Sequence, residues 1–497
     1  MRVRQFPLRS LLFSCHPQGM GTTGGRAAKP RPEALSTTDD ALDAACAGVR
    51  RKRRDLSARH VLSLGQIVFF AATGGLIYWV AREGRIELAL AWTTLFVIGS
   101  AIFALAVALR LVATGAIMKT PMPPAATWTE ALPIYTLLCP LRREAASLPA
   151  LIAALRQLDY PGDRLDVRLV VEDDDTETLE ALDNVALPRE FTVVHVPMAT
   201  PRTKPKALNY ALFDARGDFV VVYDAEDVPD RRQLRAALDA FATGGEKLGA
   251  VQAPLLIDNG RASWISGQFA AEYAIQFLGV VPLLTHFKLP PPLGGTSNHF
   301  RRKALEDVGA WDPHNVTEDA DLGYRLSRFG WRIGDIAPPT WEEAPEKLVP
   351  WLRQRARWIK GHLQTWLVLM RNPVRTMREM GVGAFFAMQL VLGGGLLAAV
   401  AHGPLLVFLA SIPFTGMAAP HVAALTLVIV GYATAALAAL FAAAKLKDPR
   451  LGLAALTMPL YWPLSTIAAA WAVFQLVVRP HHWSKTDHGR ARRNTPV

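Results

Sequence analysis

The sequence predicts an α/β domain with a mostly parallel sheet, inserted between two groups of membrane-spanning helices. Apolar residues make up 51% of the 497 residues and gather in long blocks on either side of a charged central stretch. Within that stretch, short β-rich runs alternate with amphipathic helical ones, a pattern typical of parallel sheets covered by helices. Two acidic clusters directly follow two of the β-rich runs. The expected segments are a tail (1–55), a first helix pair (56–120), the α/β domain (121–380), a second helix group (381–480) and a basic tail (481–497).

The N-terminal segment is expected to be a disordered basic tail. It ends in an unbroken basic run from Arg50 to Arg54, followed by two apolar runs, 61–81 and 88–117. Each apolar run is long enough to cross a hydrocarbon core of roughly 30 Å. Lys and Arg beside a span favour the cytoplasmic side, and two crossings return the chain to that side. The α/β domain is therefore expected in the cytoplasm, at the inner (plasma) membrane.

The C-terminal helix group contains three further apolar runs, 383–414, 421–444 and 451–478. Pro459 and Pro463 interrupt the last run, so we expect a re-entrant segment, a hairpin or an interfacial helix there rather than a simple span. Basic residues in the final tail favour a cytoplasmic C-terminus. The sequence thus predicts a multi-pass protein in contact with the lipid bilayer.

Charge and cysteine content exclude some classes of partner. The formal net charge is +11, but much of the excess lies beside the apolar runs, where topology and anionic lipid account for it. No nucleic acid partner is expected. The cysteines Cys15, Cys46 and Cys139 are widely spaced and form no CxxC pair, so neither disulfides nor a zinc site is indicated.

The central domain is expected to contain at least five strands and the helices between them. Apolar residues at helical spacing over 148–158 predict a helix between the first two strands, which makes one βαβ unit. In such sheets, ligands bind beyond the carboxyl ends of the strands. The predicted strands are 134–138, 167–171, 191–196, 219–223 and 250–254.

Acidic side chains stand at two of these strand ends. Glu172 to Asp175 follow the second strand, and Asp224 to Asp227 follow the fourth. Carboxylates placed in this way can hold Mg²⁺ or Mn²⁺, which neutralises a diphosphate leaving group. The alternative is that each cluster is a solvated loop or the N-cap of the next helix. A third acidic site, Thr317 to Asp321, opens a predicted helix and equally fits a capping sequence.

The order of these sites, followed by Gln354, Arg355, Arg357 and Trp358, resembles the inverting family 2 glycosyltransferases of the membrane synthase type. Cellulose, hyaluronan and mannan synthases belong to that group. The resemblance covers roughly residues 132–367 and implies a GT-A-type, Rossmann-like domain that uses a nucleotide-sugar donor. Its motifs are specific as an ordered set, although each is weak alone.

The resemblance implies roles for the donor side of the site. The family's first acidic pair, which contacts the nucleotide base, corresponds to Asp173 and Asp174. Its DxD metal motif falls on Asp224 and Glu226, with Glu in place of the second Asp. Lys204 corresponds to the Lys of a KxGxLN segment near the nucleotide, whereas Lys206, which replaces the Gly, equally fits a solvated charge.

The resemblance also implies roles on the acceptor side. The family's TED motif is present as Thr317, Glu318 and Asp319, with Asp319 as the general base that removes the acceptor hydroxyl proton. The QxxRW motif matches Gln354, Arg355, Arg357 and Trp358. In it, arginine faces the diphosphate and tryptophan stacks on the acceptor sugar, as a cationic fork and a flat apolar ring can do.

Three segments leave alternatives open. Glycines in 294–299, which occupies the place of the family's acceptor-bordering strand, would allow a sugar close to the backbone. The apolar segment 273–293 is expected to be an interfacial helix, with a buried core helix as the alternative. Segment 347–366 is expected to lie along the membrane with its tryptophans near the headgroups.

The leading functional prediction is a processive, inverting, metal-dependent synthase that extends a β-linked exopolysaccharide. One alternative is a single-transfer glycosyltransferase that acts on a lipid acceptor. A second alternative, from a different class, is an inactive transport or scaffold subunit. The expected partners are a nucleotide-sugar donor, a glycan or lipid-linked acceptor, a divalent cation (Mg or Mn) and the bilayer; an export partner is left open.

Overall fold

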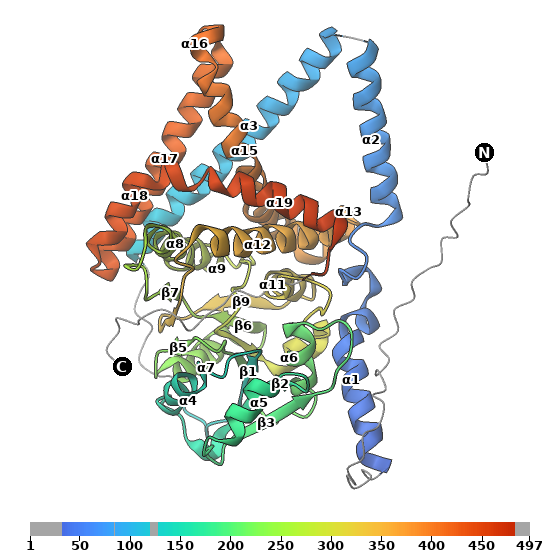
Figure 1. The fold of residues 1–497 in the computed structure, drawn as a ribbon, viewed down its shortest axis with the longest axis vertical. Coiled ribbons are helices and arrows are strands. Elements are labelled where there is room, and N and C mark those ends of the chain that lie inside the picture. The colour runs from blue at the N-terminus through green and yellow to red at the C-terminus, as the bar shows by residue number, and fades with distance from the viewer. Residues whose placement is uncertain (1–31, 84, 120–127, 483–497) are drawn as a thin grey trace, which may run out of the picture.

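The computed structural model describes residues 32–83, 85–119 and 128–482, and the structural statements below concern these residues. The described chain is arranged in three tiers (Figure 1). The α/β domain forms the lower tier, helices that lie across it form the middle tier, and long apolar helices rise above them. The C-terminal tail, predicted to be basic and cytoplasmic, lies almost wholly outside the described residues.

A seven-stranded sheet with the order β3-β2-β1-β4-β8-β6-β9 organises the α/β domain. All neighbouring strands pair in parallel except β8, which is antiparallel to both β4 and β6. A smaller sheet has the order β5-β10-β7. The strands are β1 (Tyr135–Leu141), β2 (Leu165–Glu172), β3 (Phe191–Val196), β4 (Phe219–Val222), β5 (Val228–Pro229), β6 (Leu248–Gln252), β7 (Leu255–Ile257), β8 (Asn298–Arg301), β9 (Arg332–Asp335) and β10 (Thr340–Glu342).

Helices cover both faces of the large sheet because alternate strand residues point to opposite faces. Leu137, Leu169 and Val221 pack with one helix group, and Leu138, Val170 and Val220 pack with the other. The sheet is therefore buried on both faces, as continuous apolar strands require. The first group is α4 (Leu148–Arg156), α5 (Thr176–Asp183) and α7 (Gln233–Gly244); the second is α6 (Lys204–Leu212), α10 (Arg302–Val308) and α11 (Glu318–Arg328).

The prediction of an α/β domain with a mostly parallel sheet is confirmed. The five predicted strands correspond to β1, β2, β3, β4 and β6. Strand order reverses between β1 and β4, which places a ligand crevice at their carboxyl ends. The remaining strands were not predicted, because they are short and lie in polar or proline-flanked sequence.

The prediction of a disordered tail is wrong for the part of it that the structure describes. Residues 32–52 form α1 (Pro32–Lys52), followed by the single turn η1 (Arg54–Leu56). Buried residues at helical spacing form one stripe on α1, and they pack against α6. The Asn209 side chain donates a hydrogen bond to the Ala45 carbonyl at 3.1 Å. Residues 1–31 lie outside the described part of the chain. The stripe consists of Ala41, Leu42, Ala45, Cys46 and Val49.

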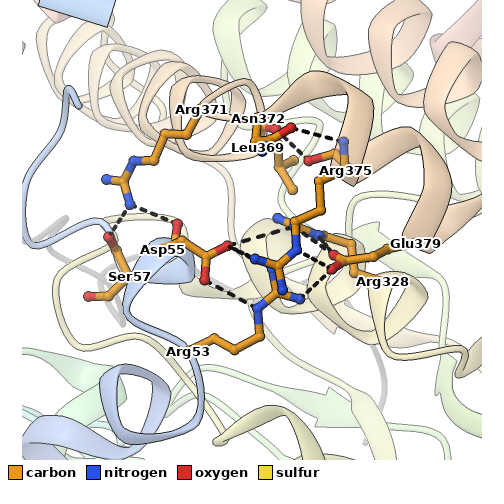
Figure 2. Close-up of polar contacts among 10 residues, drawn as sticks. Arg53, Asp55, Ser57, Arg328, Leu369, Arg371, Asn372, Arg375 and Glu379 are labelled. Atoms are coloured by element: carbon orange, nitrogen blue, oxygen red, sulfur yellow. Dashed lines mark hydrogen bonds and ion pairs between the residues drawn. The ribbon is translucent and has the colours of Figure 1, made fainter. Parts of the chain in front are cut away.

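A cluster of charged side chains ties the segment after α1 to α11 and to α13 (Pro373–Met380) (Figure 2). We call Arg53, Asp55, Arg328, Arg375 and Glu379 the Glu379 cluster. The Glu379 carboxylate accepts from Arg53 at 2.8 Å, from Arg328 at 2.7 Å and from Arg375 at 2.7 Å. Part of the basic run read as a topology signal therefore forms ion pairs within the protein.

Three helical segments are long and apolar enough to cross a membrane: Phe96–Met118, Val382–Ala410 and Ala419–Leu446. A further pair, α18 (Pro449–Tyr461) and α19 (Leu464–Val478), is bent by 58° and would count as a fourth span if it crosses as one unit. The break lies at Pro463, where the sequence predicts an irregular segment. The helices of the upper tier, these spans included, are α2 (Leu64–Glu83), α3 (Arg85–Lys119), α14 (Val382–Met388), η4 (Gln389–Gly393), α15 (Gly394–Ala410), α16 (Ile412–Thr415) and α17 (Ala419–Leu446).

The middle tier contains α8 (Trp264–Ile275), η3 (Gln276–Val280), α9 (Val281–His286) and α12 (Leu348–Leu369). Of the alternatives for segment 273–293, the buried helix describes most of it, because Phe277, Leu278 and Leu284 are buried while Phe287 is exposed. A short turn, η2 (Gly162–Arg164), precedes β2.

The tryptophans of α12 contact protein groups and do not line an exposed face as expected. The Trp351 ring is fully buried and donates a hydrogen bond to the Tyr461 hydroxyl at 2.8 Å. Trp358 stacks on Tyr273, and Trp366 donates to Gln389. These contacts arise because α12 packs against α11 and α19.

Candidate functional site

A cavity of about 660 Å³ lies between the carboxyl ends of the sheet and α12. Its walls come from the ends of β1, β2 and β4, the start of α6, segment 292–296, the start of α11, and α12. Its far side is lined by the apolar helices α3 and α15 and by the bent pair α18 and α19. Most of the residues assigned to the site from sequence meet in this cavity: Lys204, Asp224, Glu226, Glu318, Asp319, Gln354, Arg355, Arg357 and Trp358.

Lys204 and Asp224 form an ion pair on the donor side of the cavity. The Lys204 ammonium lies 2.5 Å from Asp224 Oδ1 and 2.8 Å from the Gly295 carbonyl oxygen. Lys204 begins α6, and Asp224 follows β4, so the pair joins two elements on either side of the crevice. Burial acts to lower the pKa of Lys204, but Asp224 and Glu318 raise it above its ordinary value. Lys204 is thus held as a cation where a diphosphate would need one.

Asp227 shapes the loop after β4 and does not project into the cavity. Its carboxylate accepts from the Asp224 backbone N–H at 2.7 Å and from the Thr296 hydroxyl. Burial, with the charges of Asp224 and Glu226, raises its pKa well above the ordinary value. Asp224 and Glu226 line the cavity whereas Asp227 does not. Asp227 is therefore a positioning residue for Asp224.

Glu318 and Asp319 lie at the N-terminus of α11 and face the same cavity. Burial raises the pKa of Glu318 to about 7, and the neighbouring Asp319 charge adds to the shift. Burial also raises the pKa of Asp319. Thr317, the N-cap residue, makes no side-chain capping hydrogen bond, so helix capping does not account for the motif. A buried carboxylate of raised pKa is a stronger base than a solvated one.

Two glycines bring backbone close to this acidic pair. A Cβ on Gly295 would lie 3.4 Å from Asp319 Oδ2, so segment 294–296 passes directly beside the carboxylate. A Cβ on Gly361 would lie 2.4 Å from Thr317 Oγ1. Only glycine allows α12 to approach the start of α11 this closely. The start of α11, which carries Glu318 and Asp319, is thereby held close to α12, which carries the QxxRW residues.

Arg355 and Arg357 of α12 have different surroundings. Arg357 lines the cavity near Glu318, Asp319 and Asp224, and burial lowers its pKa. Arg355 instead forms a two-bond ion pair with Glu272, at 2.8 and 2.5 Å. The Arg355 guanidinium also lies over the Trp351 and Trp358 rings, 5.2 Å from each centroid. Arg357 therefore lies beside the acidic pair, whereas Arg355 is held by Glu272 of α8.

Gln354 and Trp358 complete the α12 wall. Gln354 is buried, and its Oε1 has no hydrogen-bond partner among the described residues. Trp358 stacks on Tyr273 with ring centroids 6.1 Å apart and also packs near Phe269. A buried amide oxygen without a donor and an aromatic face suit a hydroxyl-rich ligand.

The acidic residues that follow β2, Asp173 to Asp175, have different surroundings. Asp174 is paired with Arg142 at 2.5 Å and with Arg202 at 2.9 Å. Asp175 caps α5, as the alternative interpretation of the cluster expected. Asp173 lies 3.6 Å from the His195 ring. Neither Asp173 nor Asp174 lines the cavity, although their arginine partners do, so their role toward a nucleotide base stays a prediction.

Sequence reasoning missed several residues of the cavity. Glu342, at the end of β10, lines it, and burial together with Asp227 and Glu226 raises its pKa well above the ordinary value. Glu172 is buried against Lys206 at 2.8 Å, so the solvated interpretation of Lys206 is wrong. Arg110 lines the cavity from α3. A charged residue inside an apolar run is the signal that could have found it.

The carboxylates fit a divalent cation only in part. No group of three or more His, Cys, Asp or Glu side chains within 32–83, 85–119 and 128–482 is arranged to hold a metal ion. However, Mg²⁺ commonly binds one or two carboxylates and completes its coordination with substrate phosphates and water. Asp224 and Glu226 can supply that much. The negative charges of Asp224 and Glu226 contribute to the raised pKa values of Asp227 and Glu342. A bound cation would reduce this repulsion between carboxylates.

Comparison with known proteins identifies the class. Residues 133–361 match the family described as "Glycosyltransferase like family 2". The chain is 29% identical over 303 residues to a beta-monoglucosyldiacylglycerol synthase of Synechocystis, covering 59% of this chain and 62% of the relative. Residues 133–361 therefore match a family 2 glycosyltransferase domain. Its acidic pair, QxxRW residues and ion-paired Lys204 lie within that match.

Other relatives differ in what their names describe. A probable glycosyltransferase of Bacillus subtilis, YdaM, is 28% identical over 235 residues, which cover 46% of this chain and 56% of the relative. Cellulose synthase 2 of Novacetimonas hansenii is 26% identical over 303 residues, covering 59% of this chain but 18% of that protein. The chain thus spans less than two thirds of the length of several relatives.

A solved structure shares the fold. The mannosyltransferase of Pyrobaculum calidifontis, determined in complex with GDP-Man and Mn²⁺, superposes with a TM-score of 0.51 at 21% identity. The likeness covers 77% of this chain and 98% of that one. It supports a GT-A-like α/β architecture for the domain.

Proposed function

We propose that the protein transfers a sugar, with inversion, from a nucleotide-diphospho-sugar to a lipid acceptor at the inner membrane. The observation that carries the proposal is the course of the cavity. It runs from Lys204, Asp224 and Asp319 to the walls formed by α3, α15, α18 and α19. An acceptor with an apolar body can enter between these helices and present a hydroxyl to the base. Relatives named as glucosyldiacylglycerol synthases support a lipid acceptor.

The residues of the cavity divide the chemistry among them. Asp319 accepts the proton of the acceptor hydroxyl, whose oxygen forms a bond to the anomeric carbon as the bond from that carbon to the donor phosphate breaks. Lys204 and Arg357 hold the negative charge of the departing nucleoside diphosphate. Asp224 and Glu226 would hold a divalent cation that supplies further charge neutralisation. One base is sufficient because the displacement is single.

The membrane setting belongs to the same proposal. Apolar side chains on the upper helices are widely exposed, among them Phe69 at 64%, Val407 at 73% and Phe414 at 90%. Such surfaces are costly in water and ordinary in lipid. The basic residues around 50–54 support a cytoplasmic position for the domain. The acceptor would then reach the cavity from the inner leaflet.

A second candidate is processive extension of a β-linked polysaccharide. Gln354, Arg357 and Trp358 favour it, because the QxxRW residues that are typical of processive members of the family meet in the cavity. In that case the space between α3, α15 and α19 would receive the growing glycan instead of a lipid.

The nature of the product separates the two candidates. Membranes that contain the full chain are incubated with labelled UDP-glucose, GDP-mannose or UDP-N-acetylglucosamine, and the products are divided by organic extraction. Label in the organic phase, absent for Asp319→Asn, is the expected result. A labelled product of high molecular weight that stays in the aqueous phase and is cleaved by a glycanase would overturn the lipid acceptor and support the second candidate.

A further inference from the structure

The catalytic cavity joins a smaller apolar cavity deep among the upper helices. The smaller cavity has a volume of about 120 Å³ and lies between α3, α15 and α17. Its walls are mainly aliphatic or aromatic, with Phe103, Val107, Leu390 and Val428 among them. Both cavities share a boundary formed by Arg110, Gln276, Val391, Gly395, Ala398, His402 and Trp462. A ligand that fills both must be polar at one end and apolar at the other.

Arg110 is the one full positive charge on this shared boundary. It lies within Phe96–Met118, a candidate span, and its guanidinium sits over the Trp462 ring at 4.2 Å. Across the described part of the chain, no ion pair joins Arg110 to a carboxylate. Glu272 acts on it electrostatically, but that carboxylate is already bonded to Arg355 and Tyr461.

An arginine at the boundary of the two cavities is suited to bind an anionic ligand. A charge in apolar surroundings is costly unless it is paired, and ionisable residues in spans commonly serve a substrate. The guanidinium carries five N–H donors in a fork that matches phosphate oxygens. The indole face of Trp462 offsets part of the cost, but it leaves those in-plane donors available.

We infer that Arg110 binds the phosphate of an anionic lipid acceptor, whose chains enter the apolar cavity and whose hydroxyl reaches Asp319. This inference rests on the lipid acceptor proposed above and names its class: a lipid with a phosphate between its apolar chains and its accepting hydroxyl. Because the nucleophile is a hydroxyl, its proton passes to Asp319 and the nucleoside diphosphate leaves, while the lipid phosphate at Arg110 takes no part in bond making.

Binding of two matched lipids tests the inference without any donor. Dioleoylphosphatidylglycerol and dioleoylglycerol share their chains and carry hydroxyls, but only the first has a phosphate. Both are titrated against the purified full chain in detergent, and dissociation constants are measured. We expect the phospholipid to bind at least tenfold more tightly, Arg110→Gln to lose that preference, and Arg110→Lys to keep part of it. Equal binding of both lipids by the unmodified protein would overturn the inference.

Two further variants separate the phosphate from the chains. A Cβ at Gly395 would meet no atom within 4 Å, and Gly395 lines both cavities, so Gly395→Leu adds side-chain volume at the shared boundary. This substitution is expected to weaken the binding of both lipids by a similar factor. Arg82→Gln, which removes an exposed arginine at the end of α2, is the matched charge control and should leave both constants unchanged. An unchanged phospholipid preference in Arg110→Gln contradicts the assignment.

The test also distinguishes this inference from the proposed function. In an Asp319→Asn background the chain cannot transfer sugar, yet the phospholipid preference should still depend on Arg110. That dependence supports the phosphate site even if the product proves to be a polymer. Conversely, if Arg110→Gln glycosylates both lipids at the rate of the unmodified protein, the phosphate site is overturned. The proposal of a lipid acceptor would then still hold.

Discussion

Arg355 and Glu272 form a two-bond ion pair that fastens α12 to α8, with N–O distances of 2.8 and 2.5 Å. The Tyr461 hydroxyl lies 3.1 Å from the same carboxylate and accepts from Trp351. The pair therefore links the wall of the cavity to the bent helix pair above it. The side chains are 13% and 31% exposed, so the interaction is shielded from most solvent screening.

We expect Glu272→Gln to lower the stability of the protein and the turnover number, with little change in KM for the donor. Breaking a fully buried ion pair costs about 3–5 kcal/mol; the partial exposure of Glu272 reduces our estimate to roughly 2 kcal/mol. Arg357→Gln, by contrast, should raise KM for the donor. Steady-state kinetics and thermal unfolding of both variants check the distinction. If Glu272→Gln raises KM as strongly as Arg357→Gln, Arg355 acts on the donor directly.

Asp319→Asn should reduce transfer by at least about a hundredfold, because loss of a positioned base typically removes a factor of about 10²–10⁴. Nucleotide binding should persist, since Lys204 and Arg357 are unchanged. Equilibrium binding of UDP and GDP, beside a product assay, measures both properties. Unchanged turnover would remove Asp319 from the mechanism.

The raised pKa of Glu318 predicts a stability that depends on pH. A carboxyl whose pKa rises from 4.5 to about 7 on folding favours the folded state below its unfolded pKa and loses that contribution as pH rises through the folded pKa. At about pH 8 the ionised, buried Glu318 costs on the order of 3 kcal/mol. Glu318→Gln should therefore raise the melting temperature at about pH 8 and leave it nearly unchanged at about pH 4. A variant that is equally stabilised at both values would contradict the burial argument.

Gly361→Ala should lower both stability and activity. The new Cβ would lie 2.4 Å from Thr317 Oγ1, which forces α12 away from the start of α11. Overpacking of this kind costs about 1–3 kcal/mol, and here it also moves Arg357 relative to Asp319. Gly383→Ala is the matched control, because its Cβ would make only an ordinary contact of 3.7 Å with Leu289. Equal activity of the two variants would show that the close approach is not needed.

Asp224→Ala should abolish metal-dependent transfer, and Glu226→Gln should raise the concentration of Mg²⁺ or Mn²⁺ needed for half-maximal rate. Both carboxylates line the cavity, but Asp224 is anchored by Lys204 and by the Asp227 loop. Activity is titrated with each cation after treatment with EDTA. Full activity of Asp224→Ala in EDTA would refute the metal assignment.

Much of the fold was predictable because its signals are local. Strands β1 to β4 are rich in aliphatic and β-branched residues, and the acidic residues after β2 and β4 mark the sheet edge where the crevice lies. Asp319, Arg357 and Trp358 could be assigned only through the resemblance to a family, since a helix cap or a core aromatic explains each one alone. The cavity brings them together with Lys204 and Asp224.

What escaped prediction depends on contacts between distant segments. The stripe on α1 is short and weakly apolar, so the sequence alone does not show that it is buried. It is buried because α6 packs against it. Glu342 joins the acidic group because β10 pairs with β5 and β7 in a separate small sheet. Arg355 lies two positions before Arg357 on the same helix, yet it is bonded to Glu272, 83 positions away in the sequence.

The contacts of α1 show that residues outside the family match support the α/β domain. The family match starts at residue 133, but Ala45 supports Asn209 on the helix that begins with Lys204. The Asp312 carboxylate, shortly before the TED motif, binds Ser57 and the backbone of Ala58. A chain shortened to residues 133–361 would lose the contacts that support the helix beginning with Lys204 and the segment before the TED motif. Within the described residues, the contacts that support the domain therefore extend back to α1, which lies well before the start of the family match.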